Sequence, residues 1–296
     1  MVVAVNNVSL GSPASWPAPA KLNLFLHIVG RRADGYHLLQ TAFQFIDLCD
    51  QLYFYQRPAG VIERISGADS VPPDQDLVVR AAELLASHLN EQKGVAIQLI
   101  KHIPMQAGLG GGSSDAATTL IALNHLWALG LSVDELAELG LKLGADVPVF
   151  VRGQAAWAEG VGEVLTPIFP PESYFLVIQP PVSVSTAEIF QSSELTRDTP
   201  ITTIRAFRAE GGQNDCTSVV RKHYPAVAQA IDWLGQFGQA KLTGTGACIF
   251  ASYAERAQAE RVLAQLPGDI GRGYVLKGMN QSLVLQRLQY EHTAMV

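Results

Sequence analysis

The sequence predicts an α+β protein of two domains, and three features of the chain indicate this. In residues 1–170, strand-like segments alternate with helix-like segments on both sides of a glycine-rich loop. Pro170-Pro171 then marks a boundary, because a new order of elements begins after it. In residues 171–296 that order is β-α-β-β-α-β, which is typical of a ferredoxin-like domain. A chain of 296 residues is long enough for two medium-sized domains.

In the first domain, the spacing of apolar residues predicts the elements. Residues 22–28 alternate leucine or isoleucine with other side chains, which predicts a strand with Lys21 and Asn23 on the face opposite the leucines. Ser132 and Glu135 form a capping box at the start of a helix that Gly144 ends. Further strands are expected at residues 41–48, 52–55, 95–99 and 147–151, and further helices at 78–89 and from 113 or 114 onward.

The second domain has its own regular spacing. Its expected strands are residues 174–179, 240–243, 247–252 and 273–277, and its expected helices are residues 214–238, broken near Pro225, and 255–266. Residues 1–16 have no basic start and no long apolar run, so they do not resemble a signal peptide. We expect them to form a flexible extension of the first domain.

Composition and charge exclude several classes of partner. The net charge is −6, which argues against nucleic acid or an anionic membrane as a main partner. No stretch approaches the roughly 20 apolar residues that a membrane span requires. The three cysteines, Cys49, Cys216 and Cys248, are far apart and form no CxxC pair. This pattern fits the reducing cytoplasm and indicates neither a disulfide framework nor a zinc site.

The glycine-rich loop at residues 104–114 is the strongest functional signal. Glycine tolerates positive φ and has no Cβ, so the N–H groups of such a loop can turn inward against an anion. A helix that begins directly after it adds unpaired N–H groups and the positive end of its dipole. We expect a polyphosphate to bind here, on Pro104, Met105, Gln106, Ala107, Gly108, Leu109, Gly110, Gly111, Gly112, Ser113 and Ser114.

Three other interpretations of this loop fit its spacing less well. Ser113 stands where a dinucleotide-binding fingerprint requires its last glycine. The lysine that ends a Walker A loop is absent. A purely structural turn would not need so many small residues beside the start of a helix, although the segment alone leaves that interpretation open.

Two charged residues lie in apolar surroundings and are candidates for phosphoryl-transfer chemistry. Such a reaction needs a cation for the developing charge and a group that orients or deprotonates the attacking hydroxyl. Lys21 is the only charge between Ala18 and Leu26, and Asp146 is surrounded by small and apolar residues. A close pair of opposite charge would account for both. Asp146 could instead cap a turn, and Lys21 could protect a strand edge.

A third segment, residues 241–250, places Thr243-Gly-Thr-Gly246 between two expected strands. A plain hairpin explains it. Its small residues could also admit a second anionic group.

Together these segments resemble the GHMP kinase family of small-molecule kinases. The resemblance rests on residues 17–26, 104–117, 144–150 and 242–248, and on Gly30-Arg-Arg-Ala-Asp-Gly-Tyr-His37. It runs from about Pro17 to at least Met279. The Lys21-Leu-Asn23 strand together with Asp34-Gly-Tyr-His37 is similar to the members that act on cytidine diphosphate-linked methylerythritol.

The resemblance implies a fold and a set of roles. The fold would be a ribosomal-protein-S5-like N-terminal domain packed on a ferredoxin-like domain, with the site between them. ATP would be the co-substrate, with its phosphates on residues 104–114 and with Mg²⁺ arriving alongside it. Lys21 and Asp146 would be the catalytic pair, in which Asp146 takes the proton of the 2-hydroxyl of the substrate. The protein would be a monomer or weak homodimer.

The same resemblance implies the substrate contacts. Tyr36 and Phe190 would sandwich the cytosine, and His37 would bind its edge. Asn23 and Thr186 would contact the methylerythritol phosphate portion. The alternatives are a related kinase for homoserine or a mevalonate-type alcohol, or an inactive member of the fold that binds a ligand as a sensor.

The chain departs from the family pattern at three places. The first sixteen residues have no counterpart in that pattern. Gln106-Ala107 stands where many members carry further glycine. Asp76 stands where the family often has an asparagine that contacts adenine, and a carboxylate cannot donate a hydrogen bond as an amide does.

Overall fold

One mixed sheet of ten strands runs through the protein. The computed structural model describes residues 10, 14–33, 35–67, 71–88 and 93–294. Within these residues the strands are β1 (Trp16–Arg31), β2 (His37–Gln56), β3 (Ile62–Ser66), β4 (Val95–Ile100), β5 (Ala156–Glu159), β6 (Val164–Pro167), β7 (Tyr174–Gln179), β8 (Lys241–Leu242), β9 (Ile249–Tyr253) and β10 (Arg272–Met279). The order β3-β4-β2-β10-β7-β9-β8 is continuous, with β1 and β5 also paired to β2, and β6 to β5.

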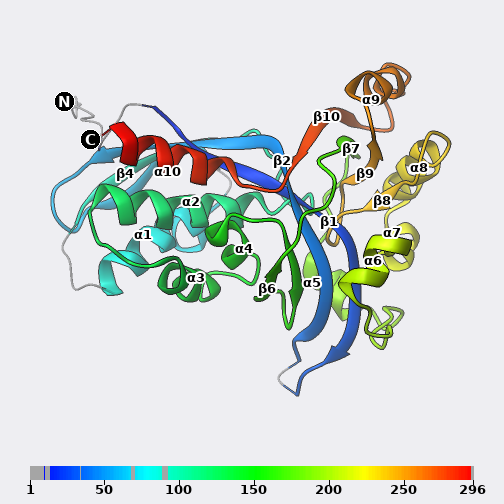
Figure 1. Ribbon diagram of the computed structural model, residues 1–296, viewed down its shortest axis with the longest axis horizontal. Coiled ribbons are helices and arrows are strands. Elements are labelled where there is room, and N and C mark those ends of the chain that lie inside the picture. Colours follow the sequence, from blue (N-terminus) through cyan, green and yellow to red (C-terminus); the bar gives the residue numbers. More distant parts are fainter. Residues whose placement is uncertain (1–9, 11–13, 34, 68–70, 89–92, 295–296) are drawn as a thin grey trace.

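The helices gather at the two ends of this sheet (Figure 1). They are α1 (Leu77–His88), α2 (Gly111–Leu126), α3 (Val133–Leu141), α4 (Val147–Arg152), α5 (Thr186–Gln191), α6 (Ile204–Glu210), α7 (Thr217–His223), α8 (Pro225–Leu234), α9 (Arg256–Leu263) and α10 (Leu283–Ala294), with a short 3-10 turn at Pro73–Gln75. Helices α1 to α4 and α10 lie at one end, and α6 to α9 lie at the other.

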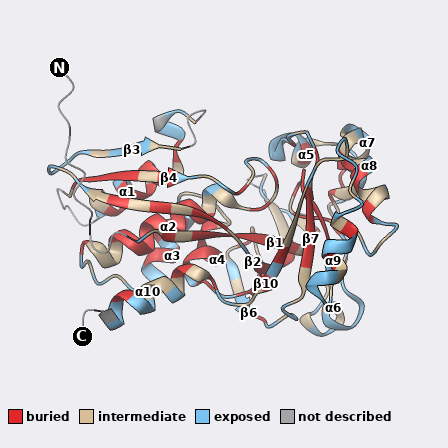
Figure 2. Cartoon of the chain, turned by 90° about the horizontal axis from the view of Figure 1, so that it is seen from above, coloured by how far each residue is buried: buried red, intermediate tan, exposed pale blue. Residues whose placement is uncertain are grey.

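The two long strands β1 and β2 span both halves of the molecule. They pair antiparallel along most of their length, with Lys21 opposite Phe45 and Asn23 opposite Phe43. Most residues of β1 are buried (Figure 2). Along its length β1 contributes to different hydrophobic cores: Trp16 and Ala18 belong to one, Ala20 and Leu22 to a second, and Leu26 and Ile28 to a third. Residues 41–48 and 52–55, which the sequence predicts as separate strands, belong to the single strand β2.

The strand order of the second half confirms the ferredoxin-like prediction. Strands β7, β8, β9 and β10 follow one another along the chain and lie side by side in the order β10-β7-β9-β8. Helices α8 and α9 pack on this part of the sheet and enclose a core that includes Leu176, Val220 and Ile249. The predicted helix over residues 214–238 is present as α7 and α8, and it is broken at Pro225 as expected.

The two halves are joined more closely than the proposed boundary after residue 170 suggests. Strand β10 pairs with β7 and, at Gly278 and Met279, with β2 of the first half. A small core containing Leu22, Phe175 and Phe250 joins the two parts. After β10 the chain returns to the first half, where α10 packs against β1 and α2. The division at residue 170 therefore separates α10 from the elements of the first half on which it packs.

One predicted element is wrong. Residues 147–151 form most of helix α4, whereas their run of valine and phenylalanine predicts a strand. Pro148 lies in the first turn, where its fixed φ favours a helix and its missing N–H costs nothing. Gly153, at φ 64°, caps the other end. Packing of α4 on α2 and α3 outweighs the strand preference of the β-branched residues.

Several short elements carry no clear sequence signal, namely β3, β5, β6, α5 and α6. Of the expected extension, residues 1–9 and 11–13 lie outside the described residues. Within the rest of it, the amide of Leu10 donates to the carbonyl of Phe54, and Trp16 is a buried residue of β1. The ordered sheet thus begins inside the segment that the sequence assigns to the extension.

Two further observations concern the chain as a whole. All three cysteines are buried and unpaired. Among the helices of the described residues, none combines the length and the apolar character that crossing a lipid bilayer requires.

Candidate active site

A cavity of about 1070 Å³ opens where the two halves meet. Strand β1, the glycine-rich loop, the start of α4 and helix α5 all contribute to its wall. Every residue that the sequence assigns to the site except Ser114 lines it: Lys21, Asn23, Tyr36, His37, residues 104–113, Asp146, Thr186 and Phe190. Residues up to 169 positions apart in the sequence are thus brought to one place.

The glycine-rich loop approaches its neighbours closely. A Cβ at Gly108 would lie 2.2 Å from the carbonyl oxygen of Thr243, so only glycine fits, and its φ of 75° also favours glycine. Gly110 has a φ of 72°. Gln106, which stands where relatives of this pattern carry glycine, adopts a φ of 52°. A side chain in this left-handed region costs roughly 1–2 kcal/mol, so Gln106 adds strain to the loop.

The loop ends at the N-terminus of α2, which is open to the cavity. Gly110 occupies the N-cap position and makes no side-chain cap. The N–H groups of Gly111, Gly112 and Ser113 belong to the first turn, where a helix offers no carbonyl partners. Together with the helix dipole they form a site for an anion.

Ser114 does not contribute to this anion site as the sequence predicts. Its hydroxyl donates to the carbonyl of Pro19 at 2.7 Å, and its N–H donates to Gly110. The side chain is fully buried. Ser114 therefore fastens the helix start to β1 and leaves the contact with an anion to Ser113 and the glycines.

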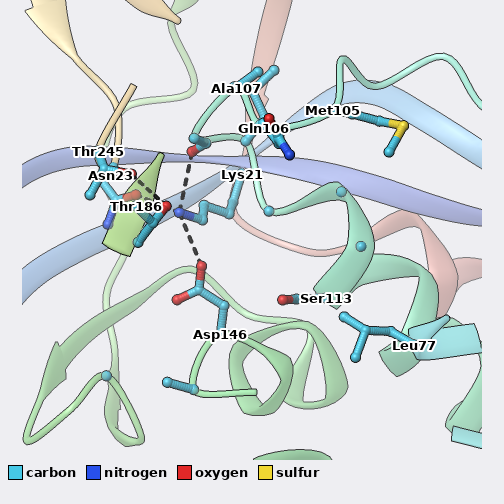
Figure 3. A pocket seen from close by; sticks show the side chains of 18 of the residues that line it. Lys21, Asn23, Leu77, Met105, Gln106, Ala107, Ser113, Asp146, Thr186 and Thr245 are labelled. Carbon is cyan, nitrogen blue, oxygen red and sulfur yellow. Dashed lines mark hydrogen bonds and ion pairs between the residues drawn. The ribbon is translucent and has the colours of Figure 1, made fainter. Parts of the chain in front are cut away.

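The ammonium of Lys21 is buried at the centre of the cavity wall (Figure 3). It lies 3.3 Å from Oδ2 of Asp146, 2.5 Å from Oδ1 of Asn23 and 3.4 Å from the carbonyl oxygen of Gly108. It also lies over the ring of Phe43, 5.2 Å from the ring centroid. The pair of opposite charge that the sequence predicts is therefore present.

Asn23 is held by the protein through both ends of its amide. Its Oδ1 accepts from Lys21, and its Nδ2 donates to the hydroxyl of Thr41 at 2.9 Å. Thr41 donates its own proton to the carbonyl of Phe25, so it can only accept from Asn23. This chain of donors fixes the orientation of the amide. The structure thus makes Asn23 a support for Lys21; because Asn23 also lines the cavity, its contact with the substrate stays a prediction.

Asp146 presents its carboxylate to the cavity. It occupies the N-cap position of α4, but its side chain makes no capping hydrogen bond. Its side chain is 37% exposed, against 4% for that of Lys21, so the pair has one buried and one accessible member. The interpretation of Asp146 as a simple cap is therefore wrong, and its free oxygen can reach a ligand.

At the other end of the cavity, three aromatic side chains lie near one another. Tyr36 is 65% exposed at the rim. Phe190 stacks on His37, with ring centroids 5.0 Å apart and planes inclined by 24°. His37 therefore covers one face of the Phe190 ring. The expected arrangement, with cytosine between Tyr36 and Phe190, does not include this stacking.

Arg197 contacts this aromatic group, and it was not identified from the sequence. Its Nε donates to Nε2 of His37 at 3.0 Å, and its guanidinium also holds the carbonyls of Phe190 and Ser192. Burial lowers the pKa of His37, and the charges of Arg197 and Arg31 lower it further. A neutral ring that accepts at Nε2 carries its proton on Nδ1, which is the edge left to donate to a ligand.

The Thr243-Gly-Thr-Gly246 turn lies between β1 and the loop. The hydroxyl of Thr243 accepts from the N–H of Asn23 and donates to the carbonyl of Gly108. The hydroxyl of Thr245 lies 2.8 Å from that of Thr186, and Gly244 and Thr245 line the cavity. The segment is more than a hairpin, because it ties the glycine-rich loop to β1.

Asp76 also lines the cavity, near the start of α1. Its carboxylate forms an ion pair with Arg64 and accepts from the N–H of Val78 at 3.0 Å. The side chain is buried. A carboxylate held in this way offers only acceptor lone pairs, so this position cannot supply the amide donor of the family pattern.

Beside the loop, Lys101 forms ion pairs with two buried carboxylates, Asp50 and Asp115. Asp50 also accepts from the N–H groups of His102 and Ile103. One cation serves two acids, and Oδ1 of Asp115 has no hydrogen-bond partner within the described part of the chain. Burial, with the charge of Asp50, raises the pKa of Asp115 to about 8. No sequence motif predicts this ion pair, because Lys101 and Asp115 are far apart in the sequence and are common residue types.

We expect the wild-type protein to lose stability as the pH rises from 5 to 8, and we expect Asp115→Asn to reduce this loss. The pKa of Asp115 is higher in the folded protein than its usual value of 3.8, so the folded state binds this proton more tightly. Stability is then present at low pH and is lost as the pH rises toward 8. Asparagine keeps an oxygen for Lys101 and cannot ionise. Thermal unfolding is measured at pH 5 and at pH 8. Between these values the melting temperature of the wild type should fall by at least about 3 °C more than that of the variant, which corresponds to roughly 1 kcal/mol.

Asp232→Asn, on the surface, is the matched control and should follow the wild type. Parallel pH profiles of wild type and Asp115→Asn would contradict the assignment of a proton to this cluster.

Comparison with known proteins agrees with this geometry. Residues 76–154 match the GHMP kinases N terminal domain, and residues 199–270 match the GHMP kinases C terminal domain. A 4-diphosphocytidyl-2-C-methyl-D-erythritol kinase of Nitrosococcus oceani is 57% identical over 274 residues, which cover 93% of this chain and 98% of the relative. The chain belongs to the GHMP kinase family, among its 4-diphosphocytidyl-2-C-methyl-D-erythritol kinases.

Two further relatives place the chain in the same group of GHMP kinases. The enzyme of that name from Alkalilimnicola ehrlichii is 56% identical over 276 residues, covering 93% of this chain and 94% of the relative. A crystal structure of a 4-(cytidine 5'-diphospho)-2C-methyl-D-erythritol kinase superposes with a TM-score of 0.77 at 31% identity, covering 89% of this chain and 98% of the other. As a GHMP kinase, the protein is an ATP-dependent enzyme that phosphorylates a small molecule.

Proposed function

We propose that the protein transfers the γ-phosphoryl group of ATP to the 2-hydroxyl of 4-diphosphocytidyl-2-C-methyl-D-erythritol. The reaction forms the 2-phosphate and ADP, and it belongs to the non-mevalonate synthesis of isoprenoid precursors. One observation carries the proposal: the ion pair of Lys21 and Asp146 faces the same cavity as the glycine-rich loop and the aromatic group at Tyr36. The names of relatives more than 50% identical supply the substrate.

Asp146 is the general base in this proposal. Its carboxylate is partly exposed and makes no capping bond, so an oxygen is available to accept the proton of the substrate hydroxyl. Lys21 forms an ion pair with Asp146 and lies close enough to stabilise the alkoxide as it forms. Asn23 and the carbonyl of Gly108 keep the ammonium in position. Little rearrangement is then needed at the moment of transfer.

The phosphates of ATP would lie on the loop and the first turn of α2. The N–H groups of Gly111, Gly112 and Ser113 and the helix dipole supply the attraction. Mg²⁺ would come with ATP, because no cluster of three or more histidine, cysteine, aspartate or glutamate side chains in the described part of the chain could hold it alone. This fits the preference of Mg²⁺ for phosphate oxygens, waters and one or two protein oxygens. Ser113 and Asp146 both face the cavity, and their side-chain oxygens are the candidates for these protein ligands of Mg²⁺ (Figure 3).

The cytosine would lie at the other end of the cavity, between Tyr36 and the ring pair of His37 and Phe190. The Nδ1–H of His37 would donate to the base, with its tautomer set by Arg197. Thr186, which is exposed and lies beside Thr245, would contact the methylerythritol phosphate portion. Homoserine or a mevalonate-type alcohol carries no base and would leave this aromatic group idle.

A substrate comparison tests the proposal directly. ADP release is measured with 4-diphosphocytidyl-2-C-methyl-D-erythritol, homoserine and mevalonate at equal concentrations. We expect turnover with the cytidylated substrate alone. Faster turnover with either of the others would assign the chain to a different kinase reaction, and ATP binding without turnover on any of them would indicate a sensor.

The variant Tyr36→Ala tests where the cytosine binds. Stacking of a base on an aromatic side chain is worth roughly 1–3 kcal/mol. The KM for the cytidylated substrate should therefore rise by about one to two orders of magnitude, while the KM for ATP stays nearly unchanged. Tyr290→Ala is the control, since Tyr290 has similar exposure and lies on α10. Equal shifts of both KM values in Tyr36→Ala would mean that Tyr36 only packs the turn.

The remaining expectations complete the proposal. They are a cytoplasmic location, a monomer or weak homodimer, and no role for nucleic acid or a membrane as partner. Sedimentation at micromolar concentration tests the oligomeric state.

A further inference from the structure

A second cavity, of about 670 Å³, lies on the other side of β1 from the active site. Leu24 lines this cavity, while its neighbour Asn23 lines the first, because successive side chains of a strand point to opposite faces. The rest of the wall comes from the junction at residues 168–173, from α6 and from strands β7, β8 and β9. No part of the proposed kinase reaction uses it.

The wall of this cavity is mostly apolar and aromatic. Ile168, Phe175 and Phe250 are buried beneath it, and Phe207 forms part of its side. Phe169 also contributes and is 72% exposed. An aromatic side chain left so exposed beside a concave apolar surface is typical of a site for a small organic molecule.

Lys241 is the unusual member of this wall. Its ammonium is half-buried, and among the residues that the structure describes it donates only to the carbonyl of Leu24, at 3.3 Å. None of the described acidic side chains forms an ion pair with it. Burial lowers the pKa of Lys241, since the charged form is poorly solvated there. An anion beside the ammonium would remove this penalty.

The charges around the cavity have one sign. The residues that line it include two cations, Lys241 and Arg208, and no aspartate or glutamate. This is notable in a protein whose net charge is −6. Arg208 is exposed on α6, so it lies where an anion would approach, whereas Lys241 is half-buried. Of the polar groups that complete the wall, Gln239 can donate hydrogen bonds, whereas the amide nitrogen of Gln44 already donates to Pro171 and Asn280.

We propose that this cavity binds an amphipathic anion, with an acidic head group paired to the ammonium of Lys241 and an apolar part against the phenylalanine side chains. The head group is a carboxylate or a phosphate. The apolar part is an aliphatic chain or small ring system that fits about 670 Å³. The site is separate from the kinase centre, and the proposal holds or fails independently of the substrate assigned there.

Titration calorimetry with three probes of equal chain length tests the proposal. Octanoate and octyl phosphate carry the two candidate head groups, and octanol carries none. We expect one of the two anions to bind one to one, at least about tenfold more tightly than octanol. The stronger of the two identifies the head group. If neither anion binds, or if octanol binds as tightly, the proposal is wrong.

Variants locate the binding. Lys241→Met should weaken binding of the preferred anion at least about tenfold, and Lys241→Arg should keep it within about threefold. Lys21→Met removes one of the cations that line the first cavity, and Lys142→Met removes an exposed cation elsewhere, so both variants should bind the anion as the wild type does. Loss of binding in Lys21→Met but not in Lys241→Met would place the anion in the active site and overturn the proposal. If Lys241→Met does not fold, Lys241→Arg and the comparison of anion with alcohol on the wild type still decide it.

Discussion

Replacing Asp146 with asparagine is expected to lower kcat by about 10²–10⁴-fold, which is the usual contribution of a general base. The amide has the size of the carboxylate and can still accept from Lys21, so the wall of the cavity should keep its shape. It cannot take up the proton of the attacking hydroxyl. The dissociation constant for ATP, measured by calorimetry, should stay within about threefold of the wild type, because we propose that the loop and α2, and not Asp146, make the phosphate contacts.

Asp134→Asn is the matched control for this variant. Asp134 is an exposed aspartate paired with Arg152 at 2.8 Å, so the same chemical change is made outside the cavity. Its kcat should equal that of the wild type. If Asp146→Asn retained turnover within about threefold, Asp146 would be reduced to a structural residue and the hydroxyl would be activated by another group.

Replacing Gly112 with valine is expected to raise the dissociation constant for ATP by at least about a hundredfold. Gly112 is exposed to the cavity in the first turn of α2, and the nearest atom to a Cβ there is Cδ1 of Leu77, 3.6 Å away. The helix therefore accepts the side chain, which occupies the space above the N–H groups. Loss of two charge-assisted hydrogen bonds, at roughly 1.5–3 kcal/mol each, gives this magnitude. Binding of the cytidylated substrate should change by less than about threefold.

Gly112 is a cleaner position for this test than its neighbour Gly110. A Cβ at Gly110 would lie 2.8 Å from Phe150 and 3.0 Å from Cε of Lys21, so a valine there would also disturb the catalytic pair. Gly268→Val is the control, since nothing lies within 4 Å of a Cβ at that position and its φ is ordinary. ATP affinity unchanged in Gly112→Val would place the phosphates away from α2.

The elements that the sequence predicts well are those whose pattern and packing agree. Strand β7 has the predicted bounds, and α7 and α8 break at Pro225, where a proline must interrupt the helix. Helix α4 fails because local preference and tertiary packing disagree, and its valines read as a strand until α2 and α3 are in place. Strands β5 and β6 are four residues each, too short for a period to stand out.

The residues of the site also fall into two groups, those that the sequence reveals and those that it does not. Lys21, Asp146 and the loop are visible in the sequence because each is unusual where it stands: a charge among apolar residues or a run of glycine. Arg197 and Arg64 are ordinary arginines in polar segments, and their roles depend on His37, 160 positions away, and on the unusual acid at Asp76. The engagement of Asn23 with Thr41 follows from the register of β1 on β2, which no short motif contains.

The return of α10 to the first half means that the second half is, in its connectivity, a long insertion. Two chain crossings join the halves, one at residues 168–173 and one after Met279. A chain cut at the first crossing would leave the first half without Val284 and Leu285, which complete its core beside Trp16 and Leu120. During synthesis on the ribosome the first half likewise emerges without these two residues. The first half cannot complete its core until nearly all of the second half has been synthesised.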